Sequence, residues 1–201
     1  MMPTARFDAA VTMARTVHHG QTRKGTDIAY LSHLVAVAGL LMEHGATEDQ
    51  VIAGLLHDAI EDATTYDGAP VTGDEVEVMI RDAFGDTVAD IVVDCSDATA
   101  DGTGTKPPWQ ARKQAYLEHL EHQATDEAVL VSLADKVHNA RAIAHDHDRL
   151  GDELWGRFSA SSADSAWYYR SLADVYARRL GDHPLIGELH IAIDRTWPAE
   201  T

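Results

Sequence analysis

Cysteine and basic residues are scarce in this chain of 201 residues, and each shortage narrows its chemistry. Cys95 is the only cysteine, which excludes an internal disulfide and a cysteine-based zinc cluster. Any metal ligands must therefore come from histidine, aspartate and glutamate. Only 16 Lys and Arg residues face 33 Asp and Glu residues, and the formal charge of -17 opposes nucleic-acid phosphates and anionic membrane surfaces. We therefore expect no nucleic-acid polymer and no membrane among its partners.

Long apolar runs and alternating patterns are also missing. The longest apolar run, residues 34–42, is far shorter than the roughly 18 residues of a membrane-spanning helix. Residues 1–10 lack the apolar region of a signal peptide, so we expect a soluble, cytoplasmic protein. No segment shows the sustained period-two alternation of a half-buried strand. A hydrophobic content of 45% is enough for one substantial core, and we expect one domain over residues 1–201.

Apolar residues instead recur at helical spacing along almost the whole chain, which predicts an all-α fold, an irregular helical bundle. Glycines, prolines and capping residues set the expected helix limits. The predicted helices cover approximately residues 5–19, 32–44, 47–62, 72–85, 86–95, 109–122, 126–145, 152–158, 163–180 and 185–195. Residues 96–108 are rich in Asp, Gly, Thr and Pro and predict a surface loop.

Residues 54–62, Gly-Leu-Leu-His-Asp-Ala-Ile-Glu-Asp, place one imidazole and three carboxylates in an otherwise apolar, helix-forming stretch. Because an unpaired carboxylate is costly in apolar surroundings, this pattern suggests a metal ion with a water beside it. On a continuous helix Gly54, His57, Asp58 and Glu61 share one stripe, where Gly54 would leave room for a ligand. The alternative interpretation is a set of solvated charges on an amphipathic helix, the common meaning of a His-Asp pair.

Further candidate ligands lie on two other predicted helices. His33 stands at the start of one, and Asp135 lies one turn before Asn139 on the other. Taken alone, each fits an ordinary helix. The order His, His-Asp, Asp on three separate helices, here His33, His57-Asp58 and Asp135, resembles the HD superfamily of metal-dependent phosphohydrolases. Two imidazoles and two carboxylates leave open metal positions for water and a phosphate oxygen, and this donor set does not select among manganese, iron, zinc and magnesium.

The surrounding motifs narrow the resemblance. Together they cover about the first 145 residues, with a motif core at about 15–145, and the helices at 152–196 are expected to pack on it. The chain is similar to the hydrolase domain of RelA/SpoT-type alarmone enzymes, and its length resembles that of a stand-alone small alarmone hydrolase. The motifs that carry the resemblance are His18-x-Gly20-Gln21-x-Arg23-Lys24, Tyr30-x-x-His33, His57-Asp58-x-x-Glu61-Asp62 and Leu133-Ala134-Asp135-Lys136-x-His138-Asn139-x-Arg141.

The resemblance implies an enzyme that hydrolyses the 3'-diphosphate of (p)ppGpp, releasing pyrophosphate and GDP or GTP, with Mn²⁺ as its metal. Carried over by motif, His33, His57, Asp58 and Asp135 would bind the metal. Glu61 and Asp62 would orient and deprotonate the attacking water, because a bound cation lowers the pKa of water and a nearby carboxylate can take the proton. The residues implied in substrate binding are Arg23, Lys24, Tyr30, Lys136, Asn139 and Arg141.

Departures from the family pattern leave the substrate open. Residues 23–30 lack the Ser-Gly-x-Pro arrangement of the long bifunctional enzymes, Leu34 replaces a frequent proline, and Ala142 stands where many relatives have a polar residue. The alternatives are another nucleotide, namely an adenine alarmone, a 2'-phosphorylated dinucleotide such as NADPH or a nucleoside monophosphate, and a non-catalytic nucleotide-sensing module. The C-terminal helices could gate the pocket or form the dimer face of a homo-oligomer.

Other polar and aromatic residues are interpreted as lying outside the site. His145 and His147 are interpreted as solvated residues at the end of a helix. Lys106, Arg112 and Lys113 are interpreted as solvated residues at the start of one. A second metal at His18 and His19 is disfavoured, because four ligands already complete a one-metal site. Four aromatic residues are expected in the core, one of which could line the pocket: Trp155, Trp167, Tyr168 and Tyr169.

Overall fold

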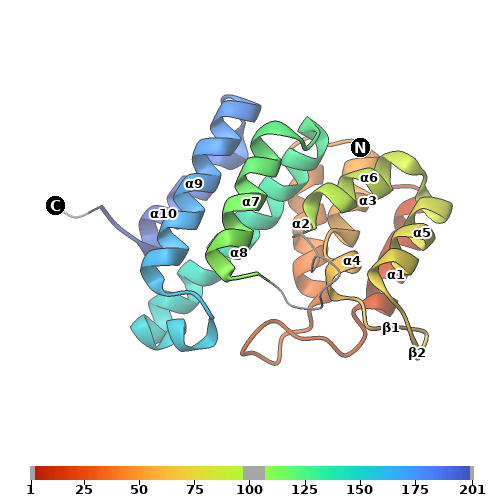
Figure 1. Cartoon of the computed structure of the whole chain (residues 1–201), viewed down its shortest axis with the longest axis horizontal. Helices are drawn as coiled ribbons and strands as arrows, with labels where there is room; N and C mark the ends of the chain where they lie inside the picture. Colours follow the sequence, from red (N-terminus) through yellow and green to blue (C-terminus); the bar gives the residue numbers. More distant parts are fainter. Residues whose placement is uncertain (1–2, 97–106, 200–201) are drawn as a thin grey trace.

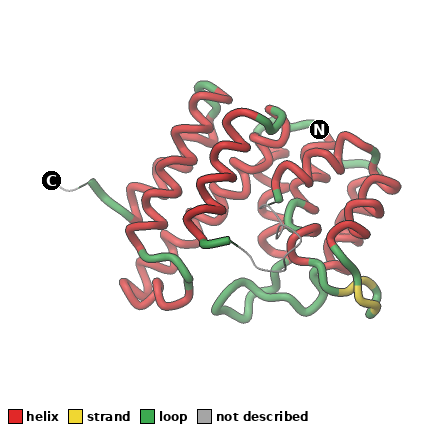
Figure 2. Tube along the Cα trace, viewed as in Figure 1, coloured by secondary structure: helices red, strands yellow, loops and turns green. Residues whose placement is uncertain are grey.

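The computed structural model describes residues 3–96 and 107–199, which fold mostly into helices (Figures 1 and 2). The all-α prediction is confirmed. Most of the loop expected at 96–108, with Lys106, lies outside the described residues. The helices are α1 (Ala5–Val17), α2 (Leu31–Glu43), α3 (Glu48–Leu56), α4 (Ala59–Asp62), α5 (Gly73–Phe84), α6 (Asp86–Cys95), α7 (Trp109–His122), α8 (Asp126–Leu150), the 3₁₀ helix η1 (Gly151–Arg157), α9 (Ser162–Leu180) and α10 (Pro184–Thr196).

A small antiparallel hairpin, formed by β1 (Thr65–Tyr66) and β2 (Ala69–Pro70), is the one element type that the periodicity did not predict among the described residues. Two-residue strands are too short to show alternation. The turn has φ 50° at Asp67 and φ 80° at Gly68, as a type I' turn requires. The Asp-Gly pair was therefore the available sequence signal.

Capping boxes set where two helices begin. At the start of α3, Gln50 N donates to Thr47 Oγ1 at 3.3 Å, while Thr47 N donates to Gln50 Oε1 at 2.8 Å. Thr72 and Glu75 make the same pair of bonds at the start of α5. Each box satisfies backbone N–H groups that the helix itself cannot bond, which fixes the direction in which α3 leads toward the site.

The helix predicted over 47–62 is not continuous. α3 ends at Leu56, and α4 restarts the helical ladder with the bond from Asp62 N to the Asp58 carbonyl at 2.9 Å. His57 and Asp58 form the junction, where Asp58 has φ -97° and ψ 0°, in the sparsely occupied bridge region that many active-site residues adopt. The single stripe expected for this segment is therefore broken at the residues that carry its chemistry.

Gly54 serves packing, and the expectation that it leaves room for a ligand is wrong. A Cβ atom at Gly54 would lie 2.5 Å from Leu41 Cδ1 and 3.4 Å from Val37 Cγ1, both on α2. The missing side chain lets α3 approach α2 closely. The neighbouring apolar residues Val51, Leu55, Leu56 and Ala59 are fully buried, as predicted.

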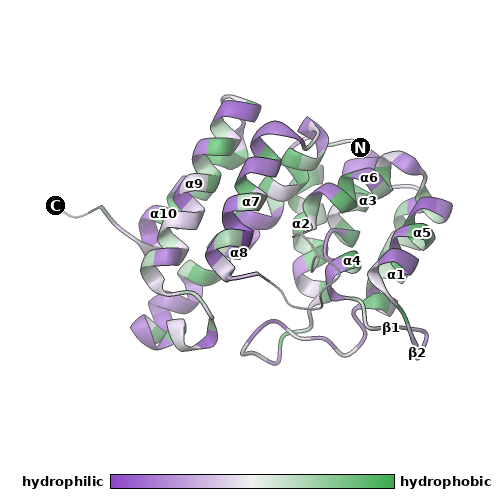
Figure 3. Cartoon of the chain, in the orientation of Figure 1, coloured by the Kyte–Doolittle hydropathy of each residue, from purple (hydrophilic) through white to green (hydrophobic). Residues whose placement is uncertain are grey.

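α8 is the central helix and contacts elements from both halves of the chain (Figure 1). It packs against α2, α3 and α6 on one side and against η1, α9 and α10 on the other. Apolar segments lie largely where helices face one another (Figure 3). α8 continues to Leu150, beyond the predicted end at His145.

No helix in the described part of the chain is long and apolar enough to cross a membrane. The one-domain organisation stays a prediction.

Candidate active site

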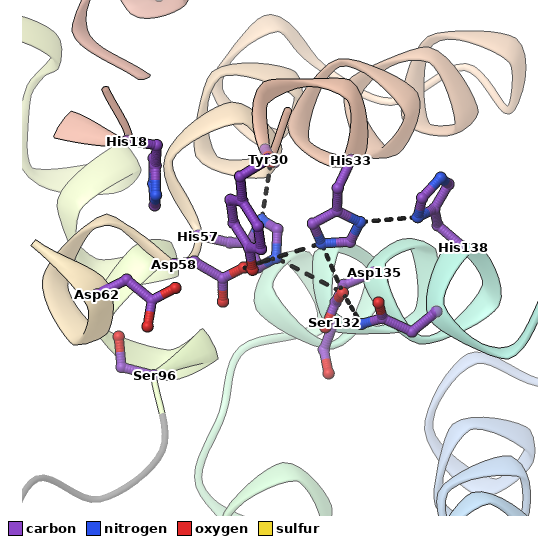
Figure 4. A network of polar contacts seen from close by, with 12 residues as sticks. His18, Tyr30, His33, His57, Asp58, Asp62, Ser96, Ser132, Asp135 and His138 are labelled. Atoms are coloured by element: carbon purple, nitrogen blue, oxygen red, sulfur yellow. Dashed lines mark hydrogen bonds and ion pairs between the residues drawn. The ribbon is translucent and has the colours of Figure 1, made fainter. Parts of the chain in front are cut away.

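Three packed helices bring the four predicted ligands together (Figure 4). His33 comes from α2, His57 and Asp58 from the α3–α4 junction, and Asp135 from α8. His33 Nε2 lies 3.1 Å from Asp135 Oδ1 and 3.8 Å from Asp58 Oδ2. His57 Nε2 lies 3.0 Å from Asp58 Oδ2 and 3.6 Å from Asp135 Oδ1. Residues separated by more than a hundred positions in the chain thus direct two nitrogens and two oxygens at one point.

The two histidine nitrogens at this point fit a divalent cation. Nε2 of His33 and Nε2 of His57 are buried, and neither has a hydrogen-bond partner of acceptable geometry among the described residues. A buried polar atom without a partner is costly, so such an atom in a native site needs an explanation. Ligand atoms of His33, His57 and Asp58 lie within 4.8 Å of one another, and Asp135 supplies a fourth at the distances above. Imidazole and carboxylate donors at this spacing suit a divalent metal.

The opposite ring nitrogens fix how the two imidazoles lie. His57 Nδ1 is 2.9 Å from the carbonyl oxygen of Gly54. Because a carbonyl oxygen only accepts, Nδ1 carries a proton, and in the neutral ring the lone pair for a metal is on Nε2. His33 Nδ1 is 2.7 Å from His138 Nδ1, on α8. Such partners on the far nitrogen orient metal-binding histidines.

The carboxylates are also held by neighbouring side chains. Lys136 Nζ lies 2.5 Å from Asp135 Oδ2, and Asn139 Nδ2 donates to Asp135 Oδ1 at 2.5 Å. The Tyr30 hydroxyl donates to Asp58 Oδ2. Burial and the Asp58 carboxylate raise the pKa of Tyr30, so its hydroxyl stays a donor. Tyr30, expected at the substrate, therefore contacts a metal-ligand candidate while also lining the cavity.

The charges of the cluster favour a proton on His57. Burial works against a charge on His57, but the carboxylates of Asp58 and Asp135 outweigh it and raise the pKa of His57 well above its ordinary value. Burial lowers the pKa of His33. Although burial opposes it, the His57 charge lowers the pKa of Asp58, and Lys136 with His57 does the same for the pKa of Asp135. The proton on His57 thus occupies the position beside two carboxylates that a bound cation would take.

Glu61 and Asp62 follow the ligands on α4 and line the cavity in front of them. Gln21 Nε2 donates to Asp62 Oδ2 at 2.9 Å, and Gln21 Oε1 lies 2.6 Å from His18 Nδ1. The His18 ring stacks on Tyr30 at a centroid distance of 5.1 Å. This chain of contacts orients the Asp62 carboxylate and places the buried His18 behind Tyr30 and Asp62.

A cavity of about 640 Å³ opens in front of the cluster. Arg141 is not part of its lining, because the Arg141 guanidinium pairs with Glu188 of α10. His33 and His57 lie behind the wall, 0% and 3% exposed. The other predicted site residues all line the cavity: Arg23, Lys24, Tyr30, Asp58, Glu61, Asp62, Asp135, Lys136 and Asn139.

The structure adds cations that the sequence interpretation placed elsewhere. Arg112 and Lys113 of α7, expected as a solvated helix start, line the cavity, and so does Arg157 of η1. With Arg23, Lys24 and Lys136, six of the 16 Lys and Arg residues of this acidic chain face one cavity. The same cavity is lined by five carboxylates, Asp58, Glu61, Asp62, Asp135 and Asp146, so cations and carboxylates nearly balance there although the chain as a whole is strongly acidic. The aromatic residues Trp109, Phe158, Tyr168 and Tyr169 line the same space.

Arg157 reaches the cavity because of a glycine in the loop that carries Arg23 and Lys24. A Cβ atom at Gly25 would lie 2.8 Å from Arg157 Cδ, and Gly25 has φ 71°, which other residues rarely adopt. Arg157 Nη1 also pairs with Asp146 Oδ2 at 3.0 Å. The only hint in the sequence was Gly25 itself, because nothing in the local pattern of η1 connects it to that loop.

Comparison with known proteins identifies the family of this chain. The chain matches the HD domain family over residues 10–158. It is 32% identical over 139 residues to the bifunctional (p)ppGpp synthase/hydrolase SpoT of Escherichia coli (strain K12), covering 69% of this chain and 18% of that protein. It is 31% identical over 158 residues to a GTP pyrophosphokinase of Myxococcus xanthus, covering 77% of this chain and 19% of that protein. The chain thus spans about a fifth of the length of these relatives.

Two solved structures share the fold. A metazoan ortholog of SpoT that hydrolyses ppGpp superposes with a TM-score of 0.72 at 21% identity, covering 98% of this chain and 99% of that one. A protein from Listeria monocytogenes EGD-e superposes with a TM-score of 0.66 at 26% identity, covering 82% and 93%. Because the family match covers residues 10–158 and includes every helix that carries the ligand cluster, the chain belongs to the HD domain family and is homologous to the hydrolase domain of SpoT and RelA enzymes.

Proposed function

We propose that this protein hydrolyses the 3'-diphosphate of (p)ppGpp, releasing pyrophosphate and GDP or GTP, with one divalent metal, Mn²⁺. One observation carries the proposal. Two buried imidazole nitrogens and two carboxylates converge at the back of a cavity that six cationic side chains line. A metal cluster facing a pocket with several cationic side chains suits an anionic phosphate ester, and the SpoT relatives are named for this chemistry on (p)ppGpp.

The proposed active-site residues divide into metal ligands and residues that act on the attacking water. When bound, the metal would lower the pKa of a water and polarise a phosphate oxygen. His33 and His57 would hold it through Nε2, and Asp58 and Asp135 through their carboxylates. Glu61 would take the proton of the attacking water, since it lies on the cavity side one turn after the junction. Asp62, held by Gln21, would orient that water.

The remaining wall would hold the nucleotide. Arg23 Nη2 donates to Asn139 Oδ1 at 2.8 Å, which directs the Arg23 guanidinium along the cavity, and Lys24 lies beside Phe158. Guanidinium and ammonium groups on this wall would bind the phosphates, and the aromatic residues provide faces for a base. Arg141 is left out of the proposed site, because it is paired with Glu188 outside the cavity.

A substrate panel tests the proposal. The purified protein, supplied with Mn²⁺, is offered ppGpp, the corresponding adenine alarmone, NADPH and nucleoside monophosphates, and the products are separated by anion exchange. Release of pyrophosphate from ppGpp at the highest kcat/KM supports the proposal. Preference for the adenine alarmone, or release of phosphate from NADPH or a monophosphate, would assign another nucleotide to this site. Tight binding of ppGpp without turnover would instead indicate a sensor.

A further inference from the structure

His138 belongs to one of the motifs that carry the resemblance, yet the proposed reaction gives it no role. Its Nδ1 lies 2.7 Å from Nδ1 of His33, with ring centroids 4.7 Å apart. Two ring nitrogens approach this closely only when one carries a proton and the other offers a lone pair. The contact therefore links the protonation pattern of His138 to that of a proposed metal ligand.

The direction of this hydrogen bond follows from the other side of the His33 ring. His33 Nε2 faces Asp58 and Asp135, and a nitrogen that binds a metal must keep its lone pair. The ring proton of His33 must then lie on Nδ1 and be donated to His138 Nδ1. His138 must in turn be neutral, with its own proton on Nε2. If His138 carried the proton on Nδ1, a neutral His33 would carry its proton on Nε2 and could not bind a metal there.

We propose that His138 is a positioning residue that accepts the Nδ1 proton of His33 and so holds His33 in the tautomer that binds the metal through Nε2. This inference rests on the metal site of the proposed function and goes beyond its ligands. Residues of α8 then lie at both edges of the His33 ring. Asp135 Oδ1 is 3.1 Å from His33 Nε2, and His138 Nδ1 is 2.7 Å from His33 Nδ1.

Burial makes the contact hard to replace. His33 is 0% exposed, so bulk water does not reach its Nδ1 if the acceptor is removed. A donor left without a partner would weaken the tautomer needed at Nε2. Partners of this kind, one step removed from the metal, typically change metal affinity by about 10- to 100-fold when they are mutated.

Metal affinity without nucleotide provides the test. The Mn²⁺ dissociation constant is measured by chelator competition for the wild type, His138→Leu and His138→Asn. We expect His138→Leu to bind Mn²⁺ about 10- to 100-fold more weakly. His138→Asn should stay close to the wild type, because Asn Oδ1 can accept from His33 in place of Nδ1. Equal affinity for all three proteins would overturn the inference.

His145→Leu is the matched control. His145 lies two turns further along α8 and also lines the cavity, but it belongs to none of the ligand contacts. Its substitution should leave Mn²⁺ affinity unchanged. An equal loss in His145→Leu and His138→Leu would show that any apolar change on this face of α8 weakens the metal, and it would overturn the specific role of His138.

Proton-detected ¹⁵N spectra of the histidine rings provide a second readout that does not depend on a variant folding. In the Zn²⁺-loaded wild type, we expect the His138 proton on Nε2 and the His33 proton on Nδ1. A His138 proton on Nδ1 would overturn the inference. Neither measurement uses a nucleotide. If ppGpp is not hydrolysed but the affinities and tautomers are as expected, only the proposed function fails; if ppGpp is hydrolysed and the affinities are equal, only this inference fails.

Discussion

Two walls of the cavity are built in different ways. The ligand wall is the cluster of His33, His57, Asp58 and Asp135, which come from packed helices; Asp58 and Asp135 line the cavity, and the buried His33 and His57 lie behind them. The nucleotide wall comes from the loop 21–30, the start of α7, and η1, and its cations are partly or fully exposed. The first wall is held in place by the hydrophobic core, whereas the second is carried by segments that can change without disturbing the core.

This difference teaches where specificity resides in such a site. On the ligand wall, neighbouring groups hold the ligands, as Lys136 holds Asp135 and Gly54 holds His57. On the nucleotide wall, Arg23 donates to Asn139 of α8, and Arg157 of η1 pairs with Asp146 of the adjoining helix α8. In the proposed function, the metal ligands would therefore be preorganised by packing, and the choice of nucleotide would depend on a few side chains on loops and helix ends.

The largest expected effect comes from breaking the ligand wall itself. Asp58→Asn keeps the size of the side chain and its contact with Tyr30, but removes the charge that a metal needs. Mn²⁺ affinity should fall by more than the about 10- to 100-fold typical of residues behind the ligands, and turnover should be lost with it. Chelator competition and pyrophosphate release measure the two effects. Retention of tight Mn²⁺ binding would contradict the ligand assignment.

Next in size is a change that separates metal binding from chemistry on the same wall. Glu61→Gln should retain Mn²⁺ affinity, because Glu61 is a water partner and not a ligand in the proposed site. Its kcat should fall by about 10²- to 10⁴-fold, the usual contribution of a general base. The comparison is made at saturating Mn²⁺. Full activity in this variant would remove Glu61 from its proposed role.

The pH dependence of metal binding tests the charge balance of the ligand wall. Asp58 and Asp135 raise the pKa of His57 well above its ordinary value, against the effect of burial, so a proton on His57 competes with the metal. The metal must displace this proton. Mn²⁺ affinity should therefore rise with pH by about tenfold per unit until the pKa of His57 is passed. Affinity that is flat between pH 6 and 8 would show that His57 is already neutral.

Two substitutions compare a cationic side chain inside the cavity with one outside it. Lys24 lines the nucleotide wall, whereas Arg141 pairs with Glu188 outside it, although both were expected to bind substrate. Lys24→Ala should raise KM by about tenfold, the value of one hydrogen bond to a charged group, with Mn²⁺ affinity unchanged. Arg141→Ala should leave KM within about twofold, since a surface ion pair contributes little. The reverse order would place the substrate on the other side of α8.

The residues of the ligand wall were predictable from the sequence, whereas those of the nucleotide wall were predictable only in part. His33, His57, Asp58 and Asp135 occur in a characteristic order, and each sits on a helix with a clear apolar periodicity, so their meeting follows once the helices pack. Arg112, Lys113 and Arg157 have no such signature. Their arrival at the cavity depends on how α7 and η1 pack against the rest of the chain, which local patterns do not encode.

The errors within the ligand wall have local causes. The periodicity of residues 47–62 continues through His57 and Asp58, so it predicts one helix and misses the bridge-region backbone of Asp58, which only the packed site stabilises. The same periodicity places Gly54 on the stripe of His57, although its Cα faces Leu41 on α2. A glycine that permits close packing and one that admits a ligand look alike in a sequence.

Gly54 therefore offers the smallest and most local test of how the ligand wall is held. In Gly54→Ala the new methyl group would meet Leu41 Cδ1 at 2.5 Å, and overpacking of this kind lowers the free energy of unfolding by about 1–3 kcal/mol. Gly39→Ala is the matched control on α2, because no heavy atom lies within 4 Å of its added Cβ; alanine should raise stability there by about 0.5–1 kcal/mol. Urea denaturation of the two variants measures both changes. If Gly54→Ala were as stable as Gly39→Ala, the Leu41 side chain or α3 could shift at no cost, and the ligand wall would not depend on a glycine at position 54.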